Sequence, residues 1–216
     1  MQFHDRGQAG RELAERLRTE QEKGNLPDPV VLALPRGGVA VAREVARALH
    51  APLDVLVVRK IGAPFQEELG VGAIAGEDDP VFDEWALARL GLGETELAPV
   101  VERERAELRR RERHYRQGRP APDLAGRTVI VVDDGLATGS TARAALRAVR
   151  RRNPGRVVLA VPVSSPEAAE LMRAEADEVL CLWQPASFMA VGLCYEEFEQ
   201  LTDEEVMRVL HATAGD

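Results

Sequence analysis

Two adjacent carboxylates, Asp133 and Asp134, lie just before a run of small and hydroxyl-bearing residues at positions 137–141 (Ala-Thr-Gly-Ser-Thr). Hydroxyl groups, and backbone N–H groups that a glycine leaves open, are donors that suit a phosphate, above all where a helix begins. Carboxylates would repel a phosphate, so the Asp pair is better suited to sugar hydroxyls or a metal ion. This spacing predicts a ligand with a phosphate at one end and vicinal hydroxyls in its middle.

Two earlier segments could bind a second anionic group. Residues 35–38 (Pro-Arg-Gly-Gly) offer the Arg36 guanidinium and two glycine N–H groups. Arg59 and Lys60 follow an apolar run, where cations pack poorly but can neutralise an anionic group of a ligand. Lys60 is one of only two lysines in the chain, which indicates that a compact ammonium is needed there. An ordinary turn and a solvated strand end remain the alternatives for these two segments.

Six apolar runs predict the strands that position these residues. The runs begin at Val30, Leu53, Val71, Val129, Val157 and Val179. Segments with helical spacing lie between most of them, so the fold class is α/β, with a doubly wound and mostly parallel sheet. In such a sheet the ligand lies outside the carboxyl ends of the strands, where all three candidate segments are expected.

The thirteen residues 129–141 (VIVVDDGLATGST) resemble the signature of the type I phosphoribosyltransferases, which bind 5-phosphoribosyl-1-pyrophosphate (PRPP). They contain neither a Walker loop nor a G-x-G-x-x-G dinucleotide loop. The resemblance implies transfer of a 5-phosphoribosyl group from PRPP to a nitrogen acceptor, such as a nucleobase or related compound. Pyrophosphate would be released and Mg²⁺ would be the cofactor. Members acting on 6-oxopurines carry an Asp at the place of Ala137, and Ala137 cannot move a proton.

The resemblance also assigns roles to individual residues. It implies that Asp133 and Asp134 contact the ribose hydroxyls and hold the metal indirectly, through those hydroxyls or water. The catalytic residues would be Arg36, Lys60, Asp133 and Asp134. The PRPP-binding residues would be Arg36, Gly37, Gly38, Arg59, Lys60, Asp133, Asp134, Ala137, Thr138, Gly139, Ser140 and Thr141.

Outside the core pattern, three segments are expected to be specific additions to one domain of residues 1–216. Residues 62–76 alternate glycines with polar residues, and the resemblance implies a mobile lid here, with Gly62, Gly70 and Gly72 as its hinges. Residues 83–119 are densely charged and predict a helical insertion between the third and fourth core strands. Residues 183–216 are predicted to form a C-terminal hood with the N-terminal segment. Their aromatic side chains, Tyr195 among them, are expected mainly to pack in the core.

Composition narrows the partners of the protein. The net charge of −8 and the glutamates interleaved among the arginines of residues 94–119 argue against nucleic acid. No apolar run is long enough for a membrane span, and the polar N-terminus does not resemble a signal peptide, so a cytoplasmic protein is expected. Cys181 and Cys194 are expected to be reduced thiols. We expect a homo-oligomer, in the simplest case a dimer.

Two other functions remain open at this stage. A non-catalytic regulator could bind PRPP on the same fold without transferring the ribosyl group. A phosphosugar hydrolase or isomerase is the third reading, and the sequence places no nucleophile or general base for it. Retention of Arg36 and Lys60 favours the transferase, because a sensor has less need of cations at the leaving group.

Overall fold

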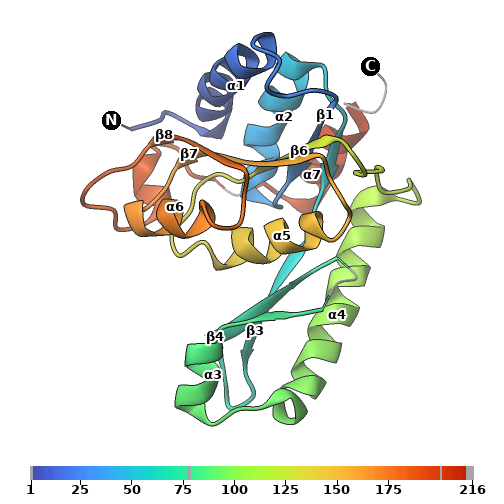
Figure 1. Ribbon diagram of the computed structural model, residues 1–216, viewed down its shortest axis with the longest axis vertical. Coiled ribbons are helices and arrows are strands. Elements are labelled where there is room, and N and C mark those ends of the chain that lie inside the picture. Colours follow the sequence, from blue (N-terminus) through green and yellow to red (C-terminus); the bar gives the residue numbers. More distant parts are fainter. Residues whose placement is uncertain (1, 77–78, 200, 213–216) are drawn as a thin grey trace.

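The central sheet of the computed structural model is parallel and has five strands, in the order β2-β1-β6-β7-β8 (Figure 1). The structure describes residues 2–76, 79–199 and 201–212. The strands are β1 (Pro29–Ala33), β2 (Leu53–Val55), β6 (Thr128–Val132), β7 (Arg156–Val163) and β8 (Glu178–Trp183). Their Val, Leu and Ala side chains are buried on both faces of the sheet, which confirms the predicted α/β fold.

Helices cover both faces of this sheet. Helices α1 (Arg6–Glu22) and α2 (Gly37–Leu49) cover one face, with α7 (Asp203–Ala212) against α2; α5 (Ser140–Arg150) and α6 (Pro166–Met172) cover the other. Successive strand residues point to opposite faces, so Val30 packs in the α5–α6 core and Val31 in the α1–α2 core. This alternation explains why the strand sequences are largely apolar, with the buried Asp54 of β2 as an exception.

The order of the strands brings two loops together. The chain runs from β1 through α2 to β2 on one side, and from β6 through α5 to β7 on the other. The loops that leave β1 and β6 therefore diverge around a crevice at the carboxyl edge of the sheet, the usual place for a ligand in such folds. The Leu34 N–H, which follows β1, donates to the Val132 carbonyl of β6 at 2.9 Å and joins the two loops at their base.

Residues 58–116 form a separate projection between β2 and β6, which we call the arm (Figure 1). It holds an antiparallel sheet of β3 (Val58–Ala63), β4 (Gln66–Ala75) and β5 (Val81–Phe82), together with α3 (Glu84–Leu90) and α4 (Glu94–Arg116). The helices confirm the predicted helical character of residues 83–119.

The arm corrects three expectations from the sequence. The run beginning at Val71 belongs to β4 of the arm, so the core sheet has five strands rather than six. The second core strand ends at Val55, and the insertion begins at β3 rather than at residue 83. Residues 62–76 form paired strands rather than an irregular loop.

Close backbone packing explains the glycines of the arm. A Cβ at Gly72 would lie 2.7 Å from the Val81 carbonyl oxygen, and one at Gly62 would lie 2.2 Å from the Glu67 carbonyl oxygen. These glycines therefore permit close approach of strands, which is a packing role rather than a hinge role.

The terminal segments, which are predicted to form a hood, meet beside the carboxyl edge of the sheet. Phe3 pairs with Tyr195 in an isolated parallel bridge, and the Phe3 N–H donates to the Cys194 carbonyl at 2.9 Å. Tyr195 is 3% exposed, which confirms its expected packing role. Residue 200 and residues 213–216 of the predicted tail lie outside the described part of the chain, and the single-domain organisation stays a prediction. Among the described helices, none combines the length and apolar character needed to cross a bilayer.

Candidate active site

The acidic pair directly follows β6. Asp133 lines a cavity of about 190 Å³ together with residues 135–142 and Val191, whereas Asp134 does not line this cavity. The Asp133 carboxylate accepts a hydrogen bond from the Asp134 N–H at 2.9 Å. Burial, and then the negative charge of Asp134, raise the pKa of Asp133 well above its ordinary value. Such a group gains from a cation or from hydroxyl donors placed in the cavity.

Residues 137–141 form the rim of the same cavity and lead into α5. The Ser165 hydroxyl donates to the Ala137 carbonyl at 2.8 Å, and the Leu136 N–H donates to the Val163 carbonyl at 2.9 Å, so β7 and α6 hold this loop from behind. Gly139 is the N-cap of α5 and has a φ of 76°. Gly139 has no side chain to cap the helix, and the Ser140 N–H makes only a long hydrogen bond, of 3.5 Å, to the Thr138 hydroxyl. The start of α5 and the hydroxyls of Thr138 and Ser140 therefore lie together at the cavity rim.

The loop of residues 35–38 lies directly against the acidic pair. A Cβ at Gly37 would lie 2.0 Å from the Asp134 Oδ2 atom, and one at Gly38 would lie 2.7 Å from the Val132 carbonyl oxygen. Only glycine permits this approach, so the paired glycines serve the contact between the two loops. The Pro35–Arg36 peptide bond is cis. The pKa of Tyr115 of α4 is raised by burial and by its hydrogen bond to Asp203. The positive charge of Arg36 acts in the opposite direction and lowers this pKa slightly.

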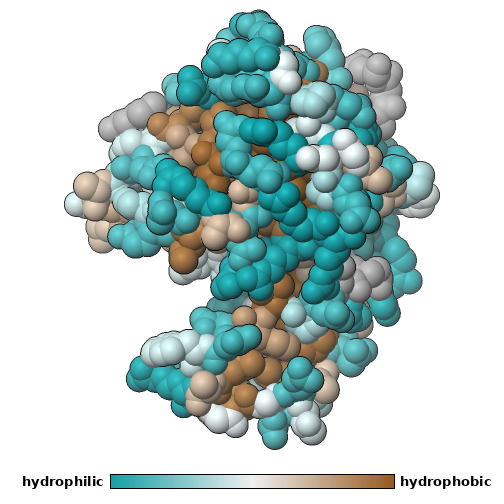
Figure 2. All heavy atoms as spheres, in the orientation of Figure 1, coloured by the Kyte–Doolittle hydropathy of each residue, from teal (hydrophilic) through white to brown (hydrophobic). Residues whose placement is uncertain are grey.

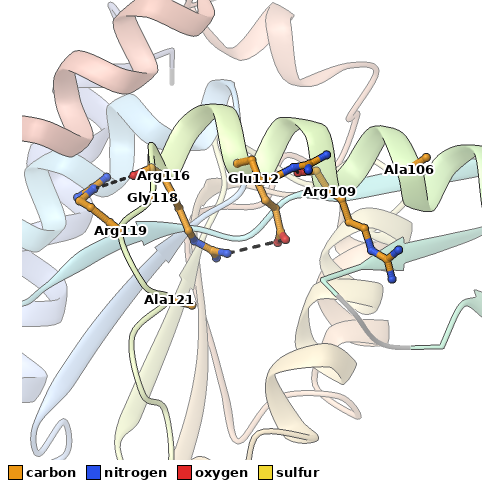
Figure 3. A pocket seen from close by; sticks show the side chains of 8 residues that line it. Ala106, Arg109, Glu112, Arg116, Gly118, Arg119 and Ala121 are labelled. Carbon is orange, nitrogen blue, oxygen red and sulfur yellow. Dashed lines mark hydrogen bonds and ion pairs between the residues drawn. The ribbon is translucent and has the colours of Figure 1, made fainter.

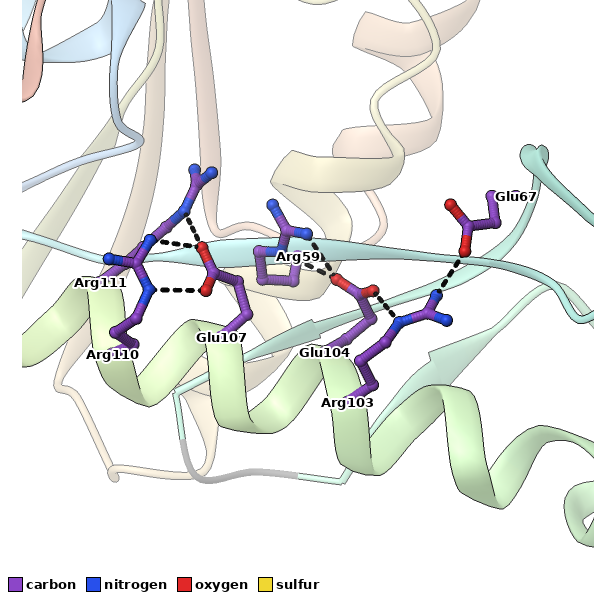
Figure 4. Close-up of polar contacts among 7 residues, drawn as sticks. All are labelled: Arg59, Glu67, Arg103, Glu104, Glu107, Arg110 and Arg111. Atoms are coloured by element: carbon purple, nitrogen blue, oxygen red, sulfur yellow. Dashed lines mark hydrogen bonds and ion pairs between the residues drawn. The ribbon is translucent and has the colours of Figure 1, made fainter.

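Arg59 and Lys60 do not follow a core strand, because they lie within β3 of the arm. Arg59 donates through Nε and Nη2 to Glu104 Oε2 of α4, at 2.9 and 2.6 Å (Figure 4). Glu104 is only 7% exposed and also pairs with Arg103. The predicted pyrophosphate ligand Arg59 therefore holds β3 to α4.

Lys60 has a different environment from its neighbour Arg59. Its side chain passes over Gly70, where a Cβ would lie 2.4 Å from the lysine Cε. It lines a cavity of about 360 Å³ that is shared with Thr138, Gly139 and Ser140. Figure 2 shows the surface hollowed between the arm and the core. The structure thus brings Lys60 to the loop of residues 137–141, from the side of the arm.

Two residues at this site were not expected from the sequence. Arg6 of α1 forms an ion pair with Asp134, with its Nη2 and Nε atoms each 2.8 Å from Asp134 Oδ2. The Tyr195 hydroxyl donates to the Asp134 carbonyl oxygen at 2.6 Å. Arg6 lies 128 positions from Asp134 in the chain, and no local pattern distinguishes it from the other arginines of α1.

Another large cavity, of about 580 Å³, lies along the second half of α4 and contains none of the predicted site residues (Figure 3). Four arginines and one glutamate line it, among them Arg116, which pairs with the buried Asp54 at 2.9 Å. Among the described residues, no group of three or more His, Cys, Asp or Glu side chains could hold a metal ion by itself. A metal at the candidate site would therefore need oxygen ligands from substrate and water.

The sequence family model and the most similar curated relatives describe the same kind of protein. The sequence model of the phosphoribosyl transferase domain matches residues 2–197. A candidate phosphoribosyl transferase of Mycobacterium tuberculosis, in strains CDC 1551 and H37Rv, is 46% identical over 208 residues. This match covers 96% of the present chain, which spans about half (46%) of the length of these curated relatives.

Solved structures extend the comparison. A crystal structure from Thermus thermophilus is 46% identical and superposes with a TM-score of 0.83, over 97% of this chain and 98% of that one. A purine phosphoribosyltransferase from Pyrococcus horikoshii Ot3 is 18% identical, with a TM-score of 0.44 over 84% of this chain and 90% of that one, and a likeness this weak says nothing about the acceptor. The match of the domain model over most of the residues, with the relatives at 46% identity, places this chain in the phosphoribosyl transferase domain family.

Proposed function

We propose that this chain transfers the 5-phosphoribosyl group of PRPP to a nitrogen acceptor and releases pyrophosphate, with Mg²⁺ as cofactor. One observation carries the proposal. The N-terminus of α5, the Asp133 carboxylate and the Gly37–Gly38 loop meet at the carboxyl edge of the sheet, so donors for phosphate flank an acceptor for sugar hydroxyls. This arrangement matches the two charged ends and the hydroxylated middle of PRPP.

The 5′-phosphate is assigned to the cavity rim at residues 137–141. The N–H groups of the first turn of α5 point their partial positive charge at this place, and Thr138 and Ser140 add hydroxyl donors. The two hydroxyl oxygens lie 3.2 Å apart, so both can reach one phosphate group.

Asp133 is assigned to the ribose hydroxyls and the metal shell. It is the carboxylate of the pair that lines the cavity, and its raised pKa indicates that a cation or hydroxyl donor there would be favourable. Mg²⁺ prefers oxygen ligands, keeps several waters and commonly uses one or two carboxylates with substrate phosphates, so a site with a single accessible carboxylate fits it. When bound, the ion would screen the charge of the departing pyrophosphate.

In the transfer step the acceptor nitrogen donates an electron pair to C1 of the ribose while the bond from C1 to the pyrophosphate oxygen breaks. The bonding pair leaves with pyrophosphate, and the sugar passes through an oxocarbenium-like state. Arg36, the Gly37 N–H group and Lys60 from the arm are assigned to the leaving group, which they would hold and neutralise. The Gly38 N–H group is left out, because it donates to the Leu34 carbonyl at 3.1 Å. Arg59 is left out of this assignment, because Glu104 holds its guanidinium.

The proton of the acceptor nitrogen has no assigned base in the loop. Ala137 is exposed at the rim and carries no ionisable group. We therefore propose an acceptor that does not depend on an acid at this position, which disfavours a 6-oxopurine.

The decisive experiment is a panel of nucleobases and small amines with PRPP and Mg²⁺, read by pyrophosphate release. Release with at least one acceptor, absent in Asp133→Asn, supports the transferase. Lys60→Ala should slow this release far more than it weakens binding of a nucleoside 5′-monophosphate, and equal effects would remove Lys60 from the leaving-group role.

The PRPP-binding regulator is the second candidate. The engagement of Arg59 by Glu104 favours it, because one expected leaving-group cation is thereby committed elsewhere. Calorimetry with PRPP and Mg²⁺ separates the two functions. Tight binding without pyrophosphate release from any acceptor would support the regulator, and an absence of binding would refute both. A homodimer and a cytoplasmic location stay predictions from the sequence.

A further inference from the structure

The Asp134 carboxylate is held by the N-terminal helix rather than presented to the cavity. Its Oδ2 atom receives two nitrogens of Arg6 at 2.8 Å each. The side chains of Arg6 and Asp134 are only 7% and 14% exposed. An ion pair this well covered from water is costly to open, because each charge would lose its partner in a poorly hydrated place.

Arg6 is itself fixed by the C-terminal segment. Its Nη1 atom donates to the Glu199 carbonyl at 2.6 Å, and its guanidinium carbon lies 3.7 Å from the centre of the Phe198 ring. A guanidinium over an aromatic face is held by the ring quadrupole in addition to its hydrogen bonds. The guanidinium therefore contacts three groups at once: the Asp134 carboxylate, the Glu199 backbone carbonyl and the Phe198 ring.

The backbone of Asp134 is held by the same segment. The Tyr195 hydroxyl donates to its carbonyl oxygen at 2.6 Å, and Tyr195 packs on Phe3 with ring centres 5.6 Å apart. On the opposite side, the Gly37 backbone lies so close that a Cβ there would be 2.0 Å from Asp134 Oδ2. Asp134 therefore lies between the hood and the loop of residues 35–38, and it touches both.

We propose that Arg6 is a positioning residue which, through Asp134, locks the hood to the two ligand loops and leaves Asp133 as the one carboxylate of the pair that contacts the ligand. This inference rests on the proposed function for the identity of that ligand. Asp134 serves as the counter-ion of Arg6. The negative charge of Asp134 therefore contributes to stability and ligand binding only while Arg6 carries its positive charge.

This claim predicts a reciprocal rescue. In Arg6→Gln, the carboxylate of Asp134 loses its partner beside Asp133, and we expect the Kd for PRPP with Mg²⁺ to rise by about tenfold, because the unpaired negative charge of Asp134 then repels the phosphates of the ligand. In Arg6→Gln/Asp134→Asn, both charges are gone and the two amides can hydrogen-bond to one another. We expect affinity within about threefold of the wild type, because the uncompensated charge has been removed.

The experiment is calorimetry with PRPP and Mg²⁺ on the wild type, the two single variants and the double variant, below the melting temperature of each as measured by circular dichroism. Asp133→Asn should lose binding whether or not Arg6 is present. Arg18→Gln is the matched control, since Arg18 also lies on α1 and pairs with Glu15 at 2.8 Å, but on an exposed surface. It should leave affinity unchanged. Weaker binding by the double variant than by Arg6→Gln would mean that Asp134 contacts the ligand, and would overturn the proposal.

Failure of the proposed function gives a different pattern. If the wild-type chain does not bind PRPP, the proposed function is refuted. The role of Arg6 as the counter-ion of Asp134 is then tested by the melting temperatures of the variants alone. Both single variants should melt below the double variant if Arg6 and Asp134 serve as counter-ions. A double variant that melts lower than either single variant would refute the lock.

Discussion

Gly38→Ala should damage both stability and ligand binding, because the added methyl group has no space. The new Cβ would lie 2.7 Å from the Val132 carbonyl oxygen and 3.0 Å from the Asp133 Cα, whereas ordinary contacts begin at 3.4 Å. Both of these neighbours belong to the backbone of β6 or its end, so neither can rotate away. The loop of residues 35–38 would have to move by several tenths of an ångström from the acidic pair.

The cost of this substitution can be bounded from opposing effects. Overpacking in a filled site costs about 1–3 kcal/mol, and replacing a glycine with alanine returns about 0.4–1 kcal/mol through the unfolded chain. We therefore expect a net loss of about 1–2 kcal/mol of unfolding free energy, which for a chain of this length lowers the melting temperature by about 2–8 °C. Displacement of Arg36 and of the Gly37 N–H group should also weaken PRPP binding by about tenfold or more, since the charge-assisted hydrogen bonds assigned to them would lengthen together.

Gly155→Ala provides the matched control. A Cβ at Gly155 would lie 2.5 Å from the Gly126 carbonyl oxygen, which is again backbone, but at the amino end of β7 and therefore at the opposite edge of the sheet. The assays are thermal unfolding by calorimetry and titration with PRPP and Mg²⁺. Both variants should lose comparable stability, and only Gly38→Ala should lose affinity. Equal affinity in the two variants would refute the assignment of residues 37–38 to the ligand site.

Two further predictions concern the arm. Glu104→Gln leaves the guanidinium of Arg59 without its carboxylate, and we expect a loss of about 2–3 kcal/mol in unfolding free energy, below the value for a fully buried pair because Arg59 is 28% exposed; an unchanged melting temperature would show that the pair contributes nothing. Arg110 and then Arg111 lower the pKa of Glu107 to about 2, from an ordinary value of 4.5. A carboxyl whose pKa is lower in the folded state stabilises above its unfolded pKa and loses this contribution as the pH falls through the folded pKa. The melting temperature of Glu107→Gln should therefore lie below that of the wild type at pH 6, by no more than the effect of about 1 kcal/mol typical of a surface pair, and the difference should shrink between pH 4.5 and pH 2; a difference independent of pH would refute the ionic origin.

Local sequence determined the core strands and the loop that follows β6. Five apolar runs predicted the strands of the core sheet, because a strand buried on both faces is apolar at most positions. The buried Asp54 of β2 is an exception, and Arg116 balances its charge. The helix start after residues 137–139 was also visible, since small and hydroxyl residues between a strand and a helical pattern have few other structural explanations. The carboxyl-edge crevice followed from strand direction alone.

The sequence did not predict which sheet contains the apolar run that begins at Val71. Its composition predicts a strand, and β4 is a strand, but composition does not say which sheet the strand joins. Its antiparallel partner β3 lies just before it in the chain, and the apolar run alone does not say whether the strand pairs with this neighbour or joins the parallel core sheet. The sequence alone therefore did not predict the arm, which follows from the observed pairing of β3 with β4.

The roles of the charged residues were decided by tertiary structure. The sequence by itself determined that an acidic pair precedes a loop of small and hydroxyl residues that suits a phosphate, and that cations occur in two earlier segments, at Arg36 and at Arg59 and Lys60. Only the fold decided that Arg6 neutralises Asp134 and that Glu104 neutralises Arg59, leaving Asp133 at the cavity. The physical reason is that a charge interacts with whatever lies within a few ångströms of it, and those neighbours come from helices 45 to 128 positions away in the chain.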